Sequence, residues 1–142
     1  MTTQRKGSST WQGSIKAGKG TVSTESGALS EQPYGFNTRF ENEAGTNPEE
    51  LIGAAHASCY SMALSLLLGE ANYEARTIRT QACVSLDKDG DGFSITAIHL
   101  TVVADVPELT NGEFQDIAEK TKQGCPISKV LNAKITLEAT LV

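Results

Sequence analysis

The sequence predicts an α+β fold, and three of its features carry that prediction. Residues 51–69 contain no Asp, Glu, Lys or Arg, which is typical of a helix surrounded by a protein core. Residues 77–86 alternate apolar and polar side chains with the period of a strand. With 142 residues, 39% of them hydrophobic and 20% charged, the chain is long enough to bury such elements, and we expect a single domain over residues 1–142.

The N-terminal third is predicted to form a β-meander, followed by the long helix. Three segments rich in Thr, Val, Ile and Phe lie between glycine turns over residues 10–40, namely STWQGSI, KGTVST and FNTRF. Asn47 can cap the helix, Pro48 suits its first position, and Glu50 can bond back to Asn47 as in a capping box. Gly69 or Asn72 is expected to end it.

The remaining elements follow from local patterns. The alternating strand carries Cys83 on its polar face, and after DKDGDG the run FSITAIHLTVVADV returns as the second strand of a hairpin. Thr110 is the expected N-cap of a helix that ends at Gly124. Pro126 then suits the start of a short helix, which places Cys125 at or near its N-cap, where free N–H groups favour an anionic sulfur. KITLEATLV is the last strand.

Charge and cysteine usage limit the classes of partner and compartment. The net charge is −5 and no basic run exceeds Arg5-Lys6, so we expect neither nucleic acid nor an anionic membrane as partner. Residues 51–69 are long enough to span a membrane, but they include His56 and several serines and lack flanking Lys or Arg, which favours a core helix. The N-terminus resembles no targeting signal, and three widely spaced cysteines predict free thiols, so a cytoplasmic protein is expected.

Two loops resemble ion or phosphate sites without matching them. DKDGDG supplies the first half of a calcium loop, but Ile98 stands where a bidentate Glu is needed, so the segment is interpreted as a charged hairpin turn. GSIKAGKG nearly matches a phosphate-binding loop, but Gly20 replaces the Ser or Thr. Cys83 is interpreted as a packing residue, with a redox role as the alternative.

Cys59 lies near the middle of the uncharged helix and raises the question of chemistry. His56 precedes it by three residues on the same helical face, which leaves open a Cys-His nucleophile pair, two metal ligands, or a buried hydrogen-bonded histidine. Far from the helix N-terminus and among apolar neighbours, the Cys59 pKa should rise. The thiol is therefore expected to be inert unless a cation reaches it.

Four segments together resemble the OsmC/Ohr family of thiol peroxidases, which detoxify organic hydroperoxides. They are GKGTVSTESGAL, QPYGFNTRFE, GTNPEELIGAAHASCYSMALS and GCPISKVL, and the resemblance runs from Trp11 nearly to the C-terminus. It implies a fold in which a long central helix packs on antiparallel sheets within an intertwined homodimer. By the same resemblance Cys59 is the peroxidatic cysteine and Cys125 the resolving one, while Arg39 and Glu49 match the charged pair beside the reactive sulfur.

These four residues also make chemical sense. A thiolate cleaves a hydroperoxide, and a guanidinium such as that of Arg39 favours the thiolate and can donate to the peroxide oxygens, held in place by a carboxylate such as Glu49. Cys125 would convert the sulfenic acid on Cys59 into a disulfide before further oxidation. On one helix, Glu49 and Cys59 are separated by about 15 Å of rise, so we expect two chains to form each site about a two-fold axis.

The expected substrate is an organic rather than an inorganic peroxide, because an apolar cleft rewards an alkyl or aryl tail. Tyr34 and Phe36, near Arg39, are candidate pocket residues. The family suggests a small dithiol reductant such as dihydrolipoamide, and no metal, haem or flavin cofactor is needed. Two alternatives stay open: a stress-induced binding protein for a hydrophobic small molecule with non-catalytic cysteines, and a hydrolase that uses Cys59 with His56.

Overall fold

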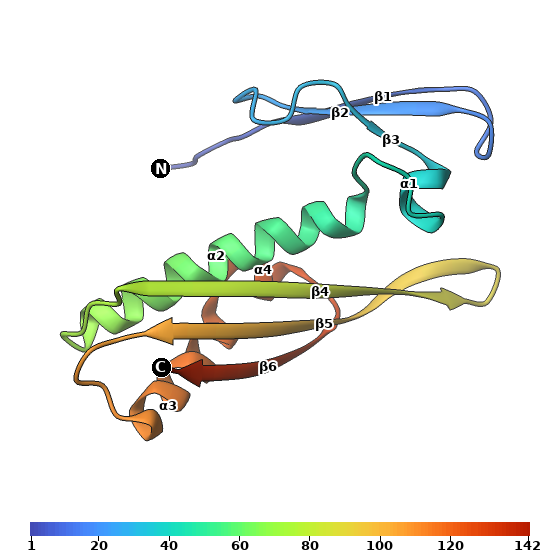
Figure 1. The fold of residues 1–142 in the computed structure, drawn as a ribbon. Coiled ribbons are helices and arrows are strands. Elements are labelled where there is room, and N and C mark those ends of the chain that lie inside the picture. The colour runs from blue at the N-terminus through green and yellow to red at the C-terminus, as the bar shows by residue number, and fades with distance from the viewer. The chain divides into compact units, whose positions relative to one another are not determined.

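The computed structural model describes residues 1–142 and divides them into two compact units, Met1–Pro48 and Glu49–Val142. The N-terminal unit contains a three-stranded antiparallel sheet with the order β1-β2-β3, followed by a short helix (Figure 1). Its elements are β1 (Gly7–Gln12), β2 (Lys19–Thr24), β3 (Gln32–Tyr34) and α1 (Phe36–Phe40). The expected meander is therefore present, with its first two strands where the sequence predicts them.

The third strand is not where the sequence predicts it, because residues 36–40 form α1 instead of a strand. The Gly35 N–H donates to Thr38 Oγ1 (2.8 Å), and the Thr38 hydroxyl donates to the Gly35 carbonyl (3.1 Å). These local bonds satisfy the backbone as a helical turn. The strand lies just before, in β3, where Pro33 is tolerated because β3 is at the edge of the sheet.

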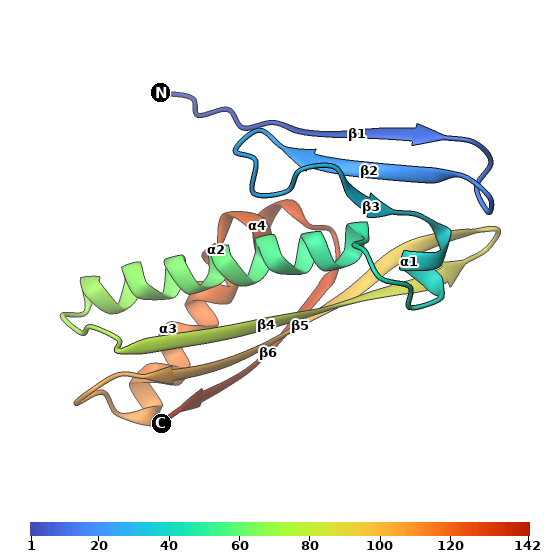
Figure 2. The same cartoon turned by 45° about the horizontal axis from the view of Figure 1, so that its top comes forward.

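The C-terminal unit is a long helix followed by a second sheet and two further helices (Figure 1). Its elements are α2 (Pro48–Glu70), β4 (Thr77–Asp89), β5 (Gly92–Asp105), α3 (Asn111–Gly124), α4 (Pro126–Val130) and β6 (Lys134–Leu141). The strand order is β4-β5-β6, and β4 pairs with β5 as the predicted antiparallel hairpin. Figure 2 shows the long hairpin with α2 running along the sheet.

The last strand corrects one expectation, because β6 pairs with β5 in parallel rather than antiparallel. The chain leaves β5 and passes through α3 and α4 before it enters β6 (Figure 2). Such a helical crossover returns the chain to the end at which β5 began, as a parallel neighbour requires. This crossover also carries Cys125, which lies between α3 and α4.

The core of the C-terminal unit lies between one face of this sheet and the helices. Alternate residues of β5 point into it, together with side chains from α2 and α3. The fully buried members are Tyr60, Leu64, Leu68, Ile98, Leu100, Val102, Ala104 and Phe114. Helix α2 thus contributes one row of its side chains to the core, and Cys59 is adjacent to that row.

Helix α2 begins and ends as the sequence predicts. Pro48 is its first residue, and the chain leaves the helix through Asn72, which has a φ of 66°. The Tyr73 N–H donates to the Leu68 carbonyl (2.8 Å) and the Asn72 N–H to the Gly69 carbonyl (3.0 Å), the bonding pattern of a Schellman cap.

By length and composition alone, α2 could also cross a membrane, a test that core helices of soluble proteins pass as well.

Candidate active site

Cys59 and Cys125 lie side by side, although 66 positions separate them in the sequence. The Cys125 thiol donates a hydrogen bond to the Cys59 sulfur, with an Sγ–Sγ distance of 3.1 Å. Both are free thiols in this structure. Cys125 is fully buried, whereas Cys59 keeps partial exposure. The arrangement therefore offers one accessible sulfur backed by a second sulfur that solvent does not reach.

Local backbone structure fixes the position of Cys125. Its N–H donates to the Thr121 carbonyl (2.9 Å), which completes the last turn of α3. Its carbonyl accepts from the Lys129 N–H (3.1 Å), which opens α4. Cys125 is thus the C-cap of α3 and the N-cap of α4, as Pro126 predicts. Two helix ends hold the residue from both sides.

The surroundings of Cys59 oppose its ionisation. Burial is the main cause that raises the pKa of the Cys59 thiol above its ordinary value, and contact with Cys125 raises it further. The backbone N–H of Ile127, in the first turn of α4, acts in the opposite direction and lowers that pKa. Because the net shift is upward, a reactive thiolate at neutral pH needs a further positive group, as the sequence predicts.

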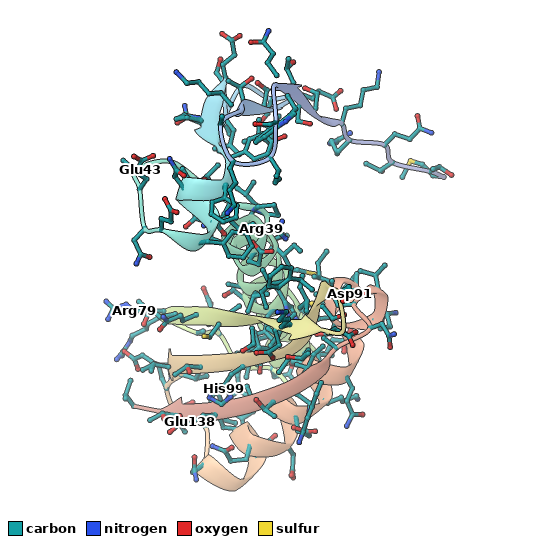
Figure 3. The ribbon with its side chains drawn as sticks, turned by 90° about the vertical axis from the view of Figure 1, so that its right-hand side faces the viewer. Arg39, Glu43, Arg79, Asp91, His99 and Glu138 are labelled. Atoms are coloured by element: carbon teal, nitrogen blue, oxygen red, sulfur yellow. The ribbon has the colours of Figure 1, made fainter.

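The two charged residues predicted for the site lie on different elements. Arg39 belongs to α1 in the N-terminal unit (Figure 3). Its guanidinium is 5.5 Å from the centre of the Phe40 ring. Glu49 is the second residue of α2 and is 8% exposed. Since α2 is continuous from Glu49 to Cys59, these two residues are about 15 Å apart along its axis. Their roles beside the sulfur remain predictions.

His56 is engaged with α4 rather than with Cys59. Its Nε2 lies 2.7 Å from Ser128 Oγ, and its Nδ1 is buried without a hydrogen-bond partner. Burial lowers the pKa of His56, which favours the neutral ring. The open question about His56 is thus answered in favour of a buried, hydrogen-bonded histidine. Neither ring nitrogen bonds to the Cys59 sulfur, so the geometry gives no support to a Cys-His hydrolase.

Ser128 and the Ile127 N–H are the parts of this cluster that sequence reasoning missed. One signal was available: His56 is three residues before Cys59 on α2, and Ser128 is three residues after Cys125 at the start of α4. Equal spacing at two segments that meet would place a second contact one helical turn from the first. His56 and Ser128 are 72 positions apart, so no local pattern in the sequence indicates that they pair.

The remaining candidates lie elsewhere. Cys83 is exposed on the outer face of the second sheet, where it pairs across the strands with His99. That face also carries Arg79 on β4 and Glu138 on β6 (Figure 3). No hydrogen bond or ion pair links Cys83 to Cys59 or Cys125.

The acidic DKDGDG segment forms the predicted hairpin turn between β4 and β5. The Ser94 hydroxyl donates to Asp89 Oδ2 (2.7 Å), and the Thr96 hydroxyl donates to Asp87 across the strands.

In the N-terminal unit, a cavity of about 400 Å³ is lined by residues that include Tyr34 and Phe36. Neither cysteine lines this cavity, so the expectation that Tyr34 and Phe36 line the substrate pocket stays a prediction.

Comparison with known proteins is consistent in family and in fold. A family model described as "OsmC-like protein" matches residues 40–140. The chain is 60% identical over 141 residues to Peroxiredoxin OsmC of Escherichia coli (strain K12), covering 99% of each chain. It is 28% identical to organic hydroperoxide resistance protein OhrB of Bacillus subtilis (strain 168), covering 86% of this chain and 88% of that protein.

A solved structure of a related protein has the same fold. The crystal structure of an organic hydroperoxide resistance protein from Elizabethkingia anophelis, with thiocyanate bound, superposes with a TM-score of 0.74 at 26% identity. The match covers 100% of both chains. With the match to the family model over most of its length and the full-length relative at 60% identity, the chain belongs to the OsmC-like protein family.

Proposed function

We propose that this protein is a thiol peroxidase that reduces organic hydroperoxides to alcohols in stress defence, through a Cys59 sulfenic acid and a Cys59–Cys125 disulfide. The observation that carries the proposal is the 3.1 Å separation of the two sulfurs, one partly exposed and one fully buried. The names of two relatives, a peroxiredoxin and an organic hydroperoxide resistance protein, support the same chemistry.

In the first step, the Cys59 thiolate attacks one oxygen of the hydroperoxide. A sulfur–oxygen bond forms, the O–O bond breaks, and the leaving alkoxide takes a proton to become the alcohol. The sulfur is oxidised by two electrons and the peroxide is reduced by two. The product is the sulfenic acid of Cys59.

In the second step, the Cys125 sulfur attacks the sulfur of that sulfenic acid. A disulfide bond forms, the sulfur–oxygen bond breaks, and the departing hydroxide takes a proton to become water. A disulfide bond is about 2 Å long, so the sulfurs have to approach by only about 1 Å from their separation in the reduced protein. A dithiol then restores both thiols by exchange, and a small dithiol of the dihydrolipoamide type is the proposed reductant.

Arg39 and Glu49 complete the proposed site. The pKa of Cys59 is raised by burial, so the sulfur needs a cation, and a guanidinium held by a carboxylate provides one that also donates to peroxide oxygens. Glu49 is too far along α2 to serve the Cys59 of its own chain directly. We therefore assign Glu49 to the Cys59 of a second chain in an isologous homodimer.

Substrate and compartment follow from the same chemistry. An apolar site gains free energy from an alkyl or aryl tail and gains none from hydrogen peroxide, so organic peroxides are the proposed substrates. Sulfur carries both electrons, so no metal, haem or flavin takes part. Free cysteines and a dithiol reductant fit the cytoplasm, which is the proposed compartment.

Mass spectrometry after one equivalent of cumene hydroperoxide tests this function. The wild-type protein is expected to lose two thiols and gain one bond between Cys59 and Cys125. Cys59→Ser is expected to consume no peroxide, and Cys125→Ser to react once and then accumulate sulfinic acid on Cys59. Cys83→Ser is the matched control, because it removes an exposed thiol outside the pair, and it should behave as wild type.

Other outcomes would favour a different function. A wild-type thiol that fails to react with the peroxide would support a binding protein for hydrophobic small molecules, with cysteines that take no part in turnover. Equal rates with cumene hydroperoxide and hydrogen peroxide would contradict the proposed substrate class.

A further inference from the structure

The contact between α2 and the start of α4 has two parts, and the proposed chemistry uses only one of them. One part is the sulfur pair, and the other is the bond between His56 Nε2 and Ser128 Oγ at 2.7 Å. His56 is one turn before Cys59, and Ser128 is one turn after Cys125. The two segments therefore run antiparallel where they meet, with one polar pair beside the sulfur pair.

The His56–Ser128 pair is shielded from water. His56 is 0% exposed and Ser128 is 9% exposed. Because water does not compete for these atoms, breaking the bond would leave buried polar groups without partners. The ring already has one buried nitrogen, Nδ1, without a partner, so Ser128 is the only group that satisfies it.

This bond joins the short helix α4 to α2. Helix α4 has only five residues, Pro126–Val130, and Ser128 is the one residue of the helix that is buried. A helix this short has little stability of its own and takes its place from tertiary contacts. The same segment holds Cys125 at its N-cap and supplies the Ile127 N–H that lowers the pKa of Cys59.

We propose that His56 and Ser128 are positioning residues for the resolving step. Their hydrogen bond holds the start of α4 against α2, and so holds the Cys125 sulfur where it can attack the Cys59 sulfenic acid. This inference rests on the proposed peroxidase function. In the step it concerns, the disulfide bond forms as the sulfur–oxygen bond of the sulfenic acid breaks and water leaves.

A competition between two fates of the sulfenic acid gives the measurement. Cys125 converts it to the disulfide, and a second hydroperoxide converts it to sulfinic acid. Reduced full-length protein is mixed with 1 to 100 equivalents of cumene hydroperoxide, free thiols are blocked, and mass spectrometry gives the disulfide and sulfinic fractions. Early time points give the rate at which the Cys59 thiol is lost.

Ser128→Ala and His56→Ala are expected to raise the ratio of sulfinic acid to disulfide by roughly fivefold, the effect of one net hydrogen bond on relative rates. The first step, loss of the Cys59 thiol, should change by less than about twofold, because the cation proposed for that step lies on α1 and the Ile127 N–H has a smaller effect on the Cys59 pKa than burial has. His56→Gln keeps a donor near the place of Nε2 and is expected to return the ratio toward wild type.

Tyr60→Phe is the matched control. It removes one buried bond from α2, in which the Tyr60 hydroxyl donates to the Ala118 carbonyl of α3 (2.9 Å). A variant that only weakened the packing of α2 would behave like Tyr60→Phe. We expect Tyr60→Phe to lower the melting temperature while leaving the oxidation ratio at the wild-type value.

Three results would overturn the inference. They are a wild-type ratio in Ser128→Ala, a raised ratio in Tyr60→Phe equal to that of Ser128→Ala, and no recovery in His56→Gln. A wild-type protein that forms no disulfide at all would instead contradict the proposed function. The two failures are therefore distinguishable.

Discussion

Opposing contacts set the charge on the Cys59 sulfur. Burial and Cys125 raise its pKa, and the Ile127 N–H lowers it. A raised pKa means that the thiol is still protonated at a pH where an ordinary cysteine has begun to ionise. Together these contacts favour the protonated thiol. The reactivity of the sulfur therefore depends on whether a cation offsets the effect of burial on its pKa.

Arg39→Gln tests that dependence. Removing the guanidinium should move the midpoint of the pH profile for Cys59 alkylation upward by about one unit or more, because a nearby opposite charge favours the thiolate by that amount. Iodoacetamide labelling in a Cys83→Ser background, followed by peptide mapping, measures the midpoint. Arg79→Gln, on the outer sheet face, is the control and should leave the profile unchanged. An unchanged midpoint in Arg39→Gln would remove Arg39 from the proposed site.

The residues of the site are predictable from the sequence to different degrees. Cys59 and Cys125 lie in segments whose order and spacing match a family, and the structure brings their sulfurs into contact. His56 is visible on the same helix, but its partner Ser128 is 72 positions away, and no local pattern connects them. Periodicity places residues on faces, but tertiary structure alone decides which faces meet.

At the scale of elements, α2 packs closely on the sheet because a glycine faces the strand. A Cβ at Gly53 would lie 3.1 Å from the Ala82 carbonyl oxygen and 3.5 Å from Val84 Cγ2. The nearest of these atoms belongs to the backbone of β4, which has little freedom to move. The approach of helix to strand at this point therefore needs a residue without a side chain.

Gly53→Val should lower the free energy of unfolding by about 2 kcal/mol, because the larger side chain overpacks the contact. A Cβ added at Gly69, on the same helix, would meet nothing within 4 Å. Gly69→Ala is thus the matched control and should raise the free energy of unfolding by about 0.5 kcal/mol through helix propensity. Urea denaturation measures both. Equal stability of the two variants would show that the contact at Gly53 is not tight.

Elements with local signals are predicted well from the sequence, and those decided by distant contacts are not. Pro48, Thr110 and Pro126 mark helix starts that the structure confirms, because caps act through neighbouring residues. Residues 36–40 are too few to show a period clearly, and they form α1 through bonds to Gly35. The parallel pairing of β6 depends on where the crossover returns the chain, which the strand pattern does not encode.

At the scale of the whole molecule, α2 carries large apolar side chains that the C-terminal unit does not cover. Met62 is 76% exposed and Leu66 is 63% exposed, on a helix that carries no charge between Glu50 and Glu70. Apolar side chains in such a row are typical of an interface. They support the proposed homodimer, in which a second chain would cover them.

A double substitution, Met62→Glu with Leu66→Glu, tests this assembly. Charge on the shared face should shift the protein from dimer to monomer in sedimentation at micromolar concentration, because each glutamate would be buried in the interface without an opposite charge. Peroxidase activity should fall with the dimer, since Glu49 is assigned to the partner's site. A wild-type protein that sediments as a monomer with full activity would contradict both the assembly and that assignment.

Cys59 and Cys125 are 66 positions apart, so the disulfide proposed between them has a consequence for the stability of the protein. A covalent link over such a span ties β4, β5 and α3 into one closed loop and removes much of the freedom of the denatured chain. Chain-entropy arguments value such a link at about 4 kcal/mol. Each cycle of oxidation and reduction would therefore alternate the protein between a less stable dithiol form and a more stable disulfide form. When the reductant is depleted under peroxide stress, the protein would accumulate in its disulfide form, which is the form that resists denaturation better.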